Sequence, residues 1–128
     1  MPCLTVAPPI EVLLVDDQRA ILAGVTALIE SEGPSMRVAG QATTGREALD
    51  LARSIQPNVI ILDVDLGGED GLALIPLFLH GCDARIVVFT CLSDPSARRN
   101  AMHLGASDFV SKAASGNELI AAIIGTTE

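Results

Sequence analysis

The feature that most constrains the fold is an unbroken apolar run, Val59–Leu62, that leads straight into the carboxylate of Asp63. A strand that is apolar at every position must be covered on both faces, which is typical of buried strands in parallel sheets. The same pattern occurs in the predicted strand at Glu11–Val15, whose apolar run Val12–Val15 leads into Asp16 and Asp17. At this stage Asp63 is either an active carboxylate at a strand end or a loop residue that follows a strand.

Apolar residues at helical spacing separate these strands, so strands and helices are expected to alternate. Paired Thr44 and Glu47 have the spacing of a helix capping box, and so do Ser115 and Glu118. In chain order we expect a strand at 11–15, a helix at 18–31, a strand at 36–42 that Gly40 weakens, and a helix that the Thr44 capping box opens and Pro57 ends. A strand at 59–62 follows, then a short or bent helix around Leu72–Leu79 with Pro76 inside it, and a strand at 85–90. The last elements are a helix that starts at Ser93-Asp94-Pro95 and stops at Gly105, a strand at 108–110 and a helix that carries Leu119–Ile124.

Composition narrows the function classes. The 128 residues, 49% of them hydrophobic, fit one domain at 11–128 behind a flexible lead-in at 1–10, with no output domain and no second unit. A net charge of −8 and an aromatic content of 2% argue against direct contact with nucleic acid. No membrane span or secretory signal is visible, and the three cysteines lack metal-ligand spacing, so a cytoplasmic protein with reduced thiols is expected.

A parallel sheet with right-handed crossovers brings all its strand ends to one edge. That edge is expected to collect Asp16, Asp17, Asp63, Asp65, Thr90 and Lys112. Carboxylates about 4 Å apart repel by about 4 kcal/mol per pair at an effective dielectric near 20, so a cation must compensate them. Hard oxygen ligands suit Mg²⁺ (or Mn²⁺). Alternatively, one of the first two aspartates caps the first helix, although a pair at a strand end favours a metal site.

Lys112 is the single lysine of the chain and follows a strand at the same edge. It is either a solvated surface lysine or an ammonium that pairs with Asp63 at rest and with a phosphoryl oxygen afterwards. Thr90 either ends its strand as an ordinary β-former or offers a hydroxyl to that oxygen. Phe109 is by default a core aromatic residue. Together, a carboxylate nucleophile, a metal, a lysine and a hydroxyl can accept a phosphoryl group as an acyl phosphate on Asp63.

With these residues in place, the chain from Glu11 to Ile124 resembles the receiver domain of two-component response regulators. The matching residues are Val15-Asp16-Asp17, Pro57 through Asp63, Gly71, Thr90, Gly105-Ala106 and Phe109 through Lys112. The resemblance implies a flavodoxin-like, doubly wound (βα)5 three-layer sandwich with a five-stranded parallel sheet in the order 2-1-3-4-5. It also implies that the chain is not an enzyme and catalyses only its own phosphotransfer and the slow hydrolysis of its acyl phosphate.

The resemblance also implies roles for single residues. Asp63 would be the phosphoacceptor for a sensor histidine kinase. The metal would be held by Asp17, Asp63 and the backbone carbonyl of Asp65, with Asp16 assisting through water. Thr90 and Lys112 would bind the phosphoryl oxygens, and Thr90 with Phe109 would form the switch.

The segment from Lys112 to Ile123 resembles the subfamily whose output is a LuxR-type helix-turn-helix domain. Such a chain would dimerise on phosphorylation and would reach DNA only through a C-terminal domain that is absent here. Whether the chain is part of a longer regulator or stands alone is open at this stage, as are its kinase and its target genes.

Three positions depart from the family pattern. Leu66-Gly67 replaces the usual methionine–proline pair, and Gly67-Gly68 is expected to give a looser loop in which Asp65 lines the phosphoryl approach and alters acyl-phosphate lifetime. Cys91 follows Thr90 and is either a redox-sensitive thiol or a small apolar residue. Ala113 stands where the family often has a cis proline, so the geometry of that peptide bond is open.

Two other functions remain possible on the sequence. Asp63-Val64-Asp65 also matches the Asp-x-Asp signature of haloacid-dehalogenase-like phosphatases, although that motif normally lies on the first strand. A receiver-like interaction module that is not phosphorylated is the other alternative. A flavodoxin-like electron carrier is excluded by the missing phosphate loop and the scarcity of aromatic residues.

Overall fold

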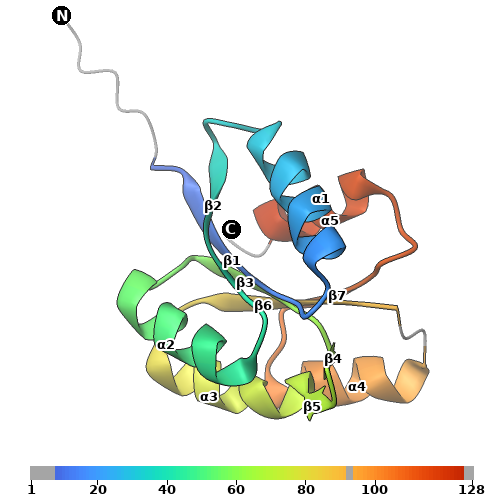
Figure 1. Ribbon diagram of the computed structural model, residues 1–128. Coiled ribbons are helices and arrows are strands. Elements are labelled where there is room, and N and C mark those ends of the chain that lie inside the picture. The colour runs from blue at the N-terminus through green and yellow to red at the C-terminus, as the bar shows by residue number, and fades with distance from the viewer. Residues whose placement is uncertain (1–7, 92–93, 126–128) are drawn as a thin grey trace, which may run out of the picture.

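The computed structural model describes residues 8–91 and 94–125 (Figure 1). Its elements are β1 (Ile10–Val15), α1 (Arg19–Glu30), β2 (Met36–Ala42), α2 (Gly45–Ile55), β3 (Val59–Leu62), β4 (Asp65–Leu66), β5 (Glu69–Asp70), the 3-10 helix η1 (Gly71–Leu74), α3 (Ile75–Gly81), β6 (Arg85–Thr90), α4 (Pro95–Leu104), β7 (Asp108–Ser111) and α5 (Gly116–Gly125). No helix in the described ranges is both long enough and apolar enough to cross a bilayer.

Five parallel strands form one sheet in the order β2-β1-β3-β6-β7. Because β4 and β5 pair only with each other, this is the predicted order 2-1-3-4-5 of the main strands. Helices α1 and α5 lie on one face of the sheet, and α2, α3 and α4 lie on the other (Figure 1). The predicted flavodoxin-like three-layer fold is confirmed.

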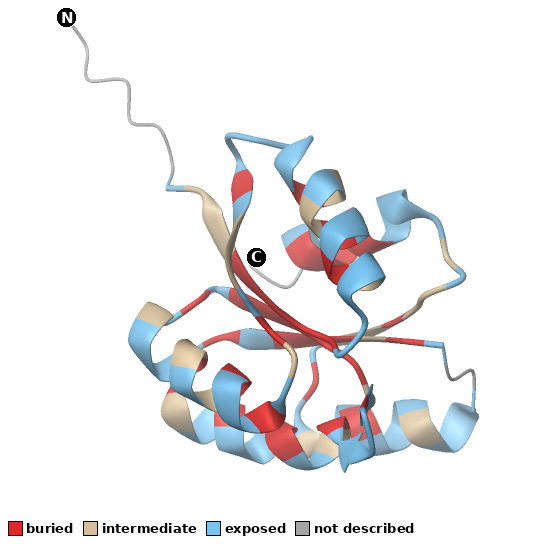
Figure 2. Cartoon of the chain, viewed as in Figure 1, coloured by how far each residue is buried: buried red, intermediate tan, exposed pale blue. Residues whose placement is uncertain are grey.

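The central strand β3 is buried at all four positions and pairs with β1 on one side and β6 on the other. Figure 2 shows the buried residues as a band that runs along the sheet between the two helix layers. Alternate residues of β1 point to opposite faces: Leu13 and Val15 enter the core under α2 and α3, whereas Val12 and Leu14 enter the core under α1 and α5. This double burial explains the continuous apolar runs.

The starts of α2 and α4 and the end of α4 follow the predicted capping residues. The Thr44 hydroxyl oxygen accepts a hydrogen bond of 3.2 Å from the Glu47 backbone N–H, and Asp94 accepts one from the Ser96 N–H at the start of α4. Gly105 ends α4 with a φ of 115°. Ser93, named in the prediction of the α4 start, and residues 1–7 of the predicted lead-in lie outside the described residues.

The connection after β3 differs from the prediction. A loose loop was expected, but Gly67 and Gly68 form the turn of the β4–β5 hairpin with φ values of 61° and 97°. Positive φ at both central residues is the pattern of a tight type I′ turn, which glycine adopts without steric cost. The predicted short helix follows as η1 and α3, with Pro76 in the first turn of α3, where its missing N–H costs no helical hydrogen bond.

Gly24 and Gly68 both have room for a methyl group but differ in backbone conformation. No heavy atom lies within 4 Å of a Cβ built on Gly24, inside α1, or on Gly68, whose φ is +97°. We expect Gly24→Ala to raise the free energy of unfolding by about 0.5–1 kcal/mol, because alanine has less conformational freedom to lose in a helix. Gly68→Ala should lower it by about 1–2 kcal/mol, because the turn requires positive φ. Urea unfolding of both variants measures this; equal effects would contradict it.

Candidate functional site

The carboxylates of the candidate site follow two adjacent central strands. Asp16 comes directly after β1, and Asp63 comes directly after β3. The Asp63 backbone N–H donates to the Val15 carbonyl, and the Asp16 N–H donates to the Ala42 carbonyl, both at 3.0 Å. These hydrogen bonds continue the sheet by one residue, so the backbone at both aspartates is fixed by the sheet. Asp16 is 4% exposed and Asp63 is 6% exposed.

Lys112 bridges these two carboxylates. Its Nζ lies 2.7 Å from Asp16 Oδ2 and 2.9 Å from Asp63 Oδ2, and its side chain is 6% exposed. The Lys112 backbone N–H donates to the Thr90 carbonyl at 2.9 Å, which fixes the lysine at the end of β7. The expected pairing with Asp63 is present in the structure, and the pairing with Asp16 was not predicted.

Burial and charge act against each other in this cluster. Burial raises the pKa of Asp16, and the hydrogen bonds from Lys112 and the Gln18 N–H, which lower it, do not cancel that effect. Burial by itself lowers the pKa of Lys112, but the hydrogen bonds to Asp16 and Asp63 outweigh burial and leave the pKa raised. The ammonium is therefore held in its charged form between the two carboxylates.

Three carboxylates form a group that can hold a cation. One oxygen each from Asp16, Asp17 and Asp63 lies within 4.8 Å of the others, and Asp17 is exposed where the other two are buried. All three donors are hard oxygens, and the solvent-facing side leaves room for water ligands, which Mg²⁺ retains when it binds proteins. The donor set fits Mg²⁺. Among the described residues, Lys112 supplies the one positive charge that forms ion pairs with this group of carboxylates.

Thr90 and Phe109 lie on the neighbouring strands β6 and β7. Thr90 is the last residue of β6, is 2% exposed and is in register with Ser111 of β7. The Phe109 ring is partly buried against the core under α3 and α4. The Arg98 guanidinium of α4 lies 6.0 Å from the centre of this ring and donates a long hydrogen bond of 3.5 Å to the Phe109 carbonyl.

Asp65 lies beside the cluster, with its carboxylate engaged elsewhere. Its side chain is not among the three carboxylates that converge, and Asp65 Oδ1 accepts a hydrogen bond of 3.1 Å from the Gly68 N–H inside the hairpin turn. The Asp65 backbone N–H points to Asp63 Oδ1 at 3.4 Å. The expectation that this carboxylate lines the phosphoryl approach stays a prediction.

Gly71 was predicted only as a matching residue, and the structure gives its physical role. Its N–H donates to the Val64 carbonyl at 2.6 Å, and a Cβ built on it would overlap the Asp63 backbone carbonyl. Any side chain at this position would displace the backbone of the candidate acceptor.

The peptide bond after Lys112, whose geometry the sequence left open, is trans, since Gly33–Pro34 is the one cis bond among the described residues.

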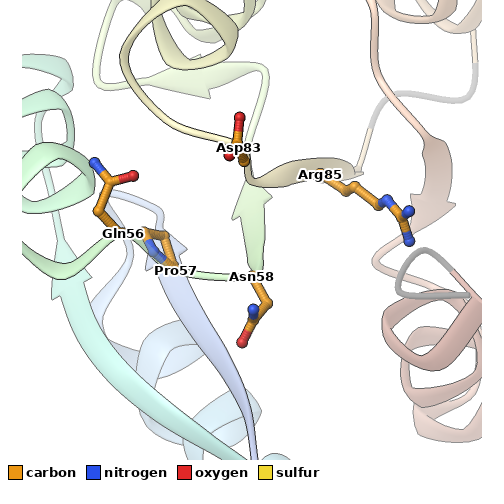
Figure 3. Close-up of a pocket in the computed structure, with 5 residues that line it drawn as sticks. All are labelled: Gln56, Pro57, Asn58, Asp83 and Arg85. Atoms are coloured by element: carbon orange, nitrogen blue, oxygen red, sulfur yellow. The ribbon is translucent and has the colours of Figure 1, made fainter.

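A cavity of about 410 Å³ lies at the opposite end of the sheet, where the chain enters β3 and β6. Figure 3 shows its lining residues, Gln56, Pro57, Asn58, Asp83 and Arg85. The polar groups of Gln56 and Asn58 are already used: Gln56 Nε2 donates to the Arg53 and Gly81 carbonyls, and Asn58 Oδ1 accepts from the Glu11 N–H. This cavity lies at the end of the sheet opposite to Asp16 and Asp63, and it takes no part in the candidate site.

Comparison with known proteins identifies similar chains across most of this length. Residues 12–124 match the family described as response regulator receiver domain. The chain is 30% identical over 109 residues to protein-glutamate methylesterase/protein-glutamine glutaminase 1 of Methanosarcina acetivorans, covering 84% of this chain and 31% of that protein. It therefore spans about a third of the length of this curated relative.

Two solved structures are similar over most of the fold. A two-component response regulator of the LuxR family from an Aurantimonas species superposes with a TM-score of 0.87 at 29% identity, covering 93% of this chain and 85% of that one. A response regulator from Burkholderia pseudomallei, solved with a phosphorylated aspartic acid and a calcium ion, gives a TM-score of 0.79 at 30% identity, covering 88% of this chain and 65% of that one. Because a methylesterase and a LuxR-family regulator both match, the predicted LuxR-type subfamily is not singled out.

The lysine bridge predicts a pH-dependent loss of stability. Lys112→Met should lower the free energy of unfolding at pH 7 by about 3 kcal/mol, because it leaves buried carboxylates unpaired. The loss should shrink as pH falls towards 4. Without the ammonium the pKa of Asp16, already raised by burial, rises further, so the folded variant binds protons before the unfolded chain does.

Arg37→Met is the matched control. It breaks the Arg37–Glu11 pair, whose side chains are 61% and 29% exposed, and should cost less than about 1 kcal/mol with little pH dependence. Urea unfolding at several pH values measures both variants. Equal losses, or a Lys112→Met loss that grows towards acid pH, would contradict the prediction.

Proposed function

The chain belongs to the response regulator receiver domain family, and on that basis we propose that Asp63 accepts a phosphoryl group from the phosphohistidine of a sensor histidine kinase. The observation that carries the proposal is the convergence of Asp63 with Asp16, Asp17 and Lys112 at one end of the sheet. A carboxylate oxygen of Asp63 attacks phosphorus, the P–N bond to the histidine breaks, and an acyl phosphate forms.

The metal-binding residues in this proposal are Asp17 and Asp63, with the Asp65 backbone carbonyl as a third ligand and Asp16 assisting through water. Mg²⁺ bound there supplies positive charge to the carboxylates and to the phosphoryl oxygens. The hard oxygen donors within 4.8 Å of one another support this assignment. The relative from Burkholderia pseudomallei, solved with a phosphorylated aspartic acid and a calcium ion, supports it as well.

Lys112 and Thr90 bind the phosphoryl oxygens. Lys112 already lies 2.9 Å from Asp63 Oδ2, so after phosphorylation its ammonium remains within reach of the new oxygens. The Thr90 hydroxyl moves towards the phosphoryl group, and Phe109 turns inward into the space beside it. The partly buried Phe109 ring, in contact with Arg98 of α4, supports a switch that reaches the surface formed by α4 and β7.

The output that this receiver controls is a separate part of the proposal. Our preferred proposal is a DNA-binding output of the LuxR type in the same polypeptide, with homodimerisation on phosphorylation, based on the sequence from Lys112 to Ile123 and on the likeness to a LuxR-family regulator. The likeness to a methylesterase makes an enzymatic output domain the alternative. In either arrangement the receiver itself performs only its own phosphotransfer and slow hydrolysis of the acyl phosphate.

Acetyl phosphate with Mg²⁺, followed by intact mass measurement, tests the acceptor. We expect the wild type to gain one phosphoryl group and Asp63→Asn to gain none. Asp65→Asn is the matched control, since Asp65 is also an aspartate at this strand end but is exposed. It should be phosphorylated, because its amide oxygen can still accept from the Gly68 N–H. Chelation of Mg²⁺ should abolish the gain.

Other outcomes point to the alternative functions. Multiple-turnover hydrolysis of a phosphomonoester would favour a phosphatase that uses Asp63 and Asp65. A folded wild-type protein that gains no phosphoryl group at any acetyl phosphate concentration would favour an interaction module.

The lifetime of the acyl phosphate tests the role of Asp65 separately. A carboxylate beside the phosphoryl group repels an incoming anionic nucleophile and can orient a water molecule, so its charge should change the hydrolysis rate. Asp65→Asn is expected to change the half-life by about threefold or more. Intact mass followed over time after removal of acetyl phosphate measures it, and identical half-lives would contradict the role.

A further inference from the structure

The β4–β5 hairpin is attached to α2 by one charged hydrogen bond. Glu69 Oε1 accepts from the backbone N–H of Gly45, the first residue of α2, at 2.9 Å. The first N–H groups of a helix have no partner within the helix, and its N-terminus carries partial positive charge, so a carboxylate is favoured there. A Cβ on Gly45 would lie 2.9 Å from Glu69 Oε2, so this close approach depends on glycine.

The same hairpin adjoins the proposed metal site. A Cβ built on Gly67, at the hairpin turn, would lie 3.4 Å from Asp17 Oδ2. The hairpin begins with Asp65, and its next residue, Leu66, is 3% exposed in the core under α2 and α3. The position of the hairpin therefore sets the position of the backbone at Asp65 and of the wall beside Asp17.

We propose that Glu69 is a positioning residue for the metal site: by holding the hairpin on the N-terminus of α2, it fixes the Asp65 backbone and the turn beside Asp17 in the geometry that binds Mg²⁺. The inference rests on the metal site of the proposed function. It assigns to Glu69 a role that neither the sequence pattern nor the family resemblance supplies.

A second glutamate at the same helix end separates positioning from simple capping. Glu47 Oε1 accepts from the Thr43 N–H at 2.9 Å, within the capping box of α2. Glu47 and Glu69 both place a carboxylate at the N-terminus of α2, but Glu69 belongs to the hairpin and Glu47 belongs to the helix. If capping is their whole role, removing either should affect Mg²⁺ binding alike.

The test is an NMR titration with MgCl₂ at constant ionic strength, monitored by the amide signals of Gly67 and Gly68, because the chain has no Trp or Tyr for fluorescence. Glu69→Ala should weaken Mg²⁺ binding by about threefold to tenfold, the range expected when one charged hydrogen bond no longer orders the loop. Glu69→Gln, whose amide oxygen can still accept from Gly45, should remain within about twofold of the wild type. Glu47→Ala should keep the wild-type affinity, although urea unfolding should show reduced stability.

Each other result overturns the inference. Equal weakening in Glu69→Ala and Glu69→Gln would assign the effect to lost charge, and equal weakening in Glu69→Ala and Glu47→Ala would assign it to helix capping. A wild type that binds Mg²⁺ and a Glu69→Ala variant with unchanged affinity would overturn the inference alone. A wild type with no response to MgCl₂ would overturn the proposed metal site and this inference together.

Discussion

The bridge from one ammonium to two buried carboxylates is the interaction on which the candidate site depends. A parallel sheet brings its strand ends to one edge, and this chain places aspartates at the ends of both β1 and β3. Lys112 starts from the end of β7, beyond β6 in the sheet, and its long side chain reaches Asp16 and Asp63 at 2.7 and 2.9 Å. The single ammonium offsets part of the charge of the two buried carboxylates and satisfies one oxygen of each.

The same bridge makes the site responsive to a change of charge. A cation or a phosphoryl group bound at Asp63 would alter what Lys112 can pair with, and the Lys112 backbone N–H is hydrogen-bonded to the carbonyl of Thr90 at the end of β6. Phe109 lies on β7, three residues before Lys112, and its ring contacts Arg98 of α4. A rearrangement at the carboxylates would therefore reach the surface of α4 through few contacts, because the ends of β6 and β7 lie side by side.

Strong sequence signals predicted the regular elements closely. The bounds of β3 and β6 were predicted to the residue, because apolar runs buried on two faces and flanked by polar or proline residues have few alternative interpretations. The bounds of β2 were also predicted, although this edge strand is buried only at its two end residues. Capping residues placed the starts of α2 and α4 in the same way. The β4–β5 hairpin was missed because strands of two residues show no periodicity, and Gly67-Gly68 was interpreted as flexibility, although such a pair between short segments also signals a type I′ turn.

The sequence by itself determined the alternation of the five main strands with helices, the polar residues at the ends of these strands and the presence of a single lysine among them. These properties follow from local periodicity, capping and the rule that parallel strands end at one edge. Only the tertiary structure decided that Lys112 pairs with Asp16 as well as Asp63, that the Asp65 carboxylate holds its own turn, and that Glu69 binds the N-terminus of α2. Such contacts join residues distant in sequence or depend on side-chain direction, and both are set by how the packed elements lie in space.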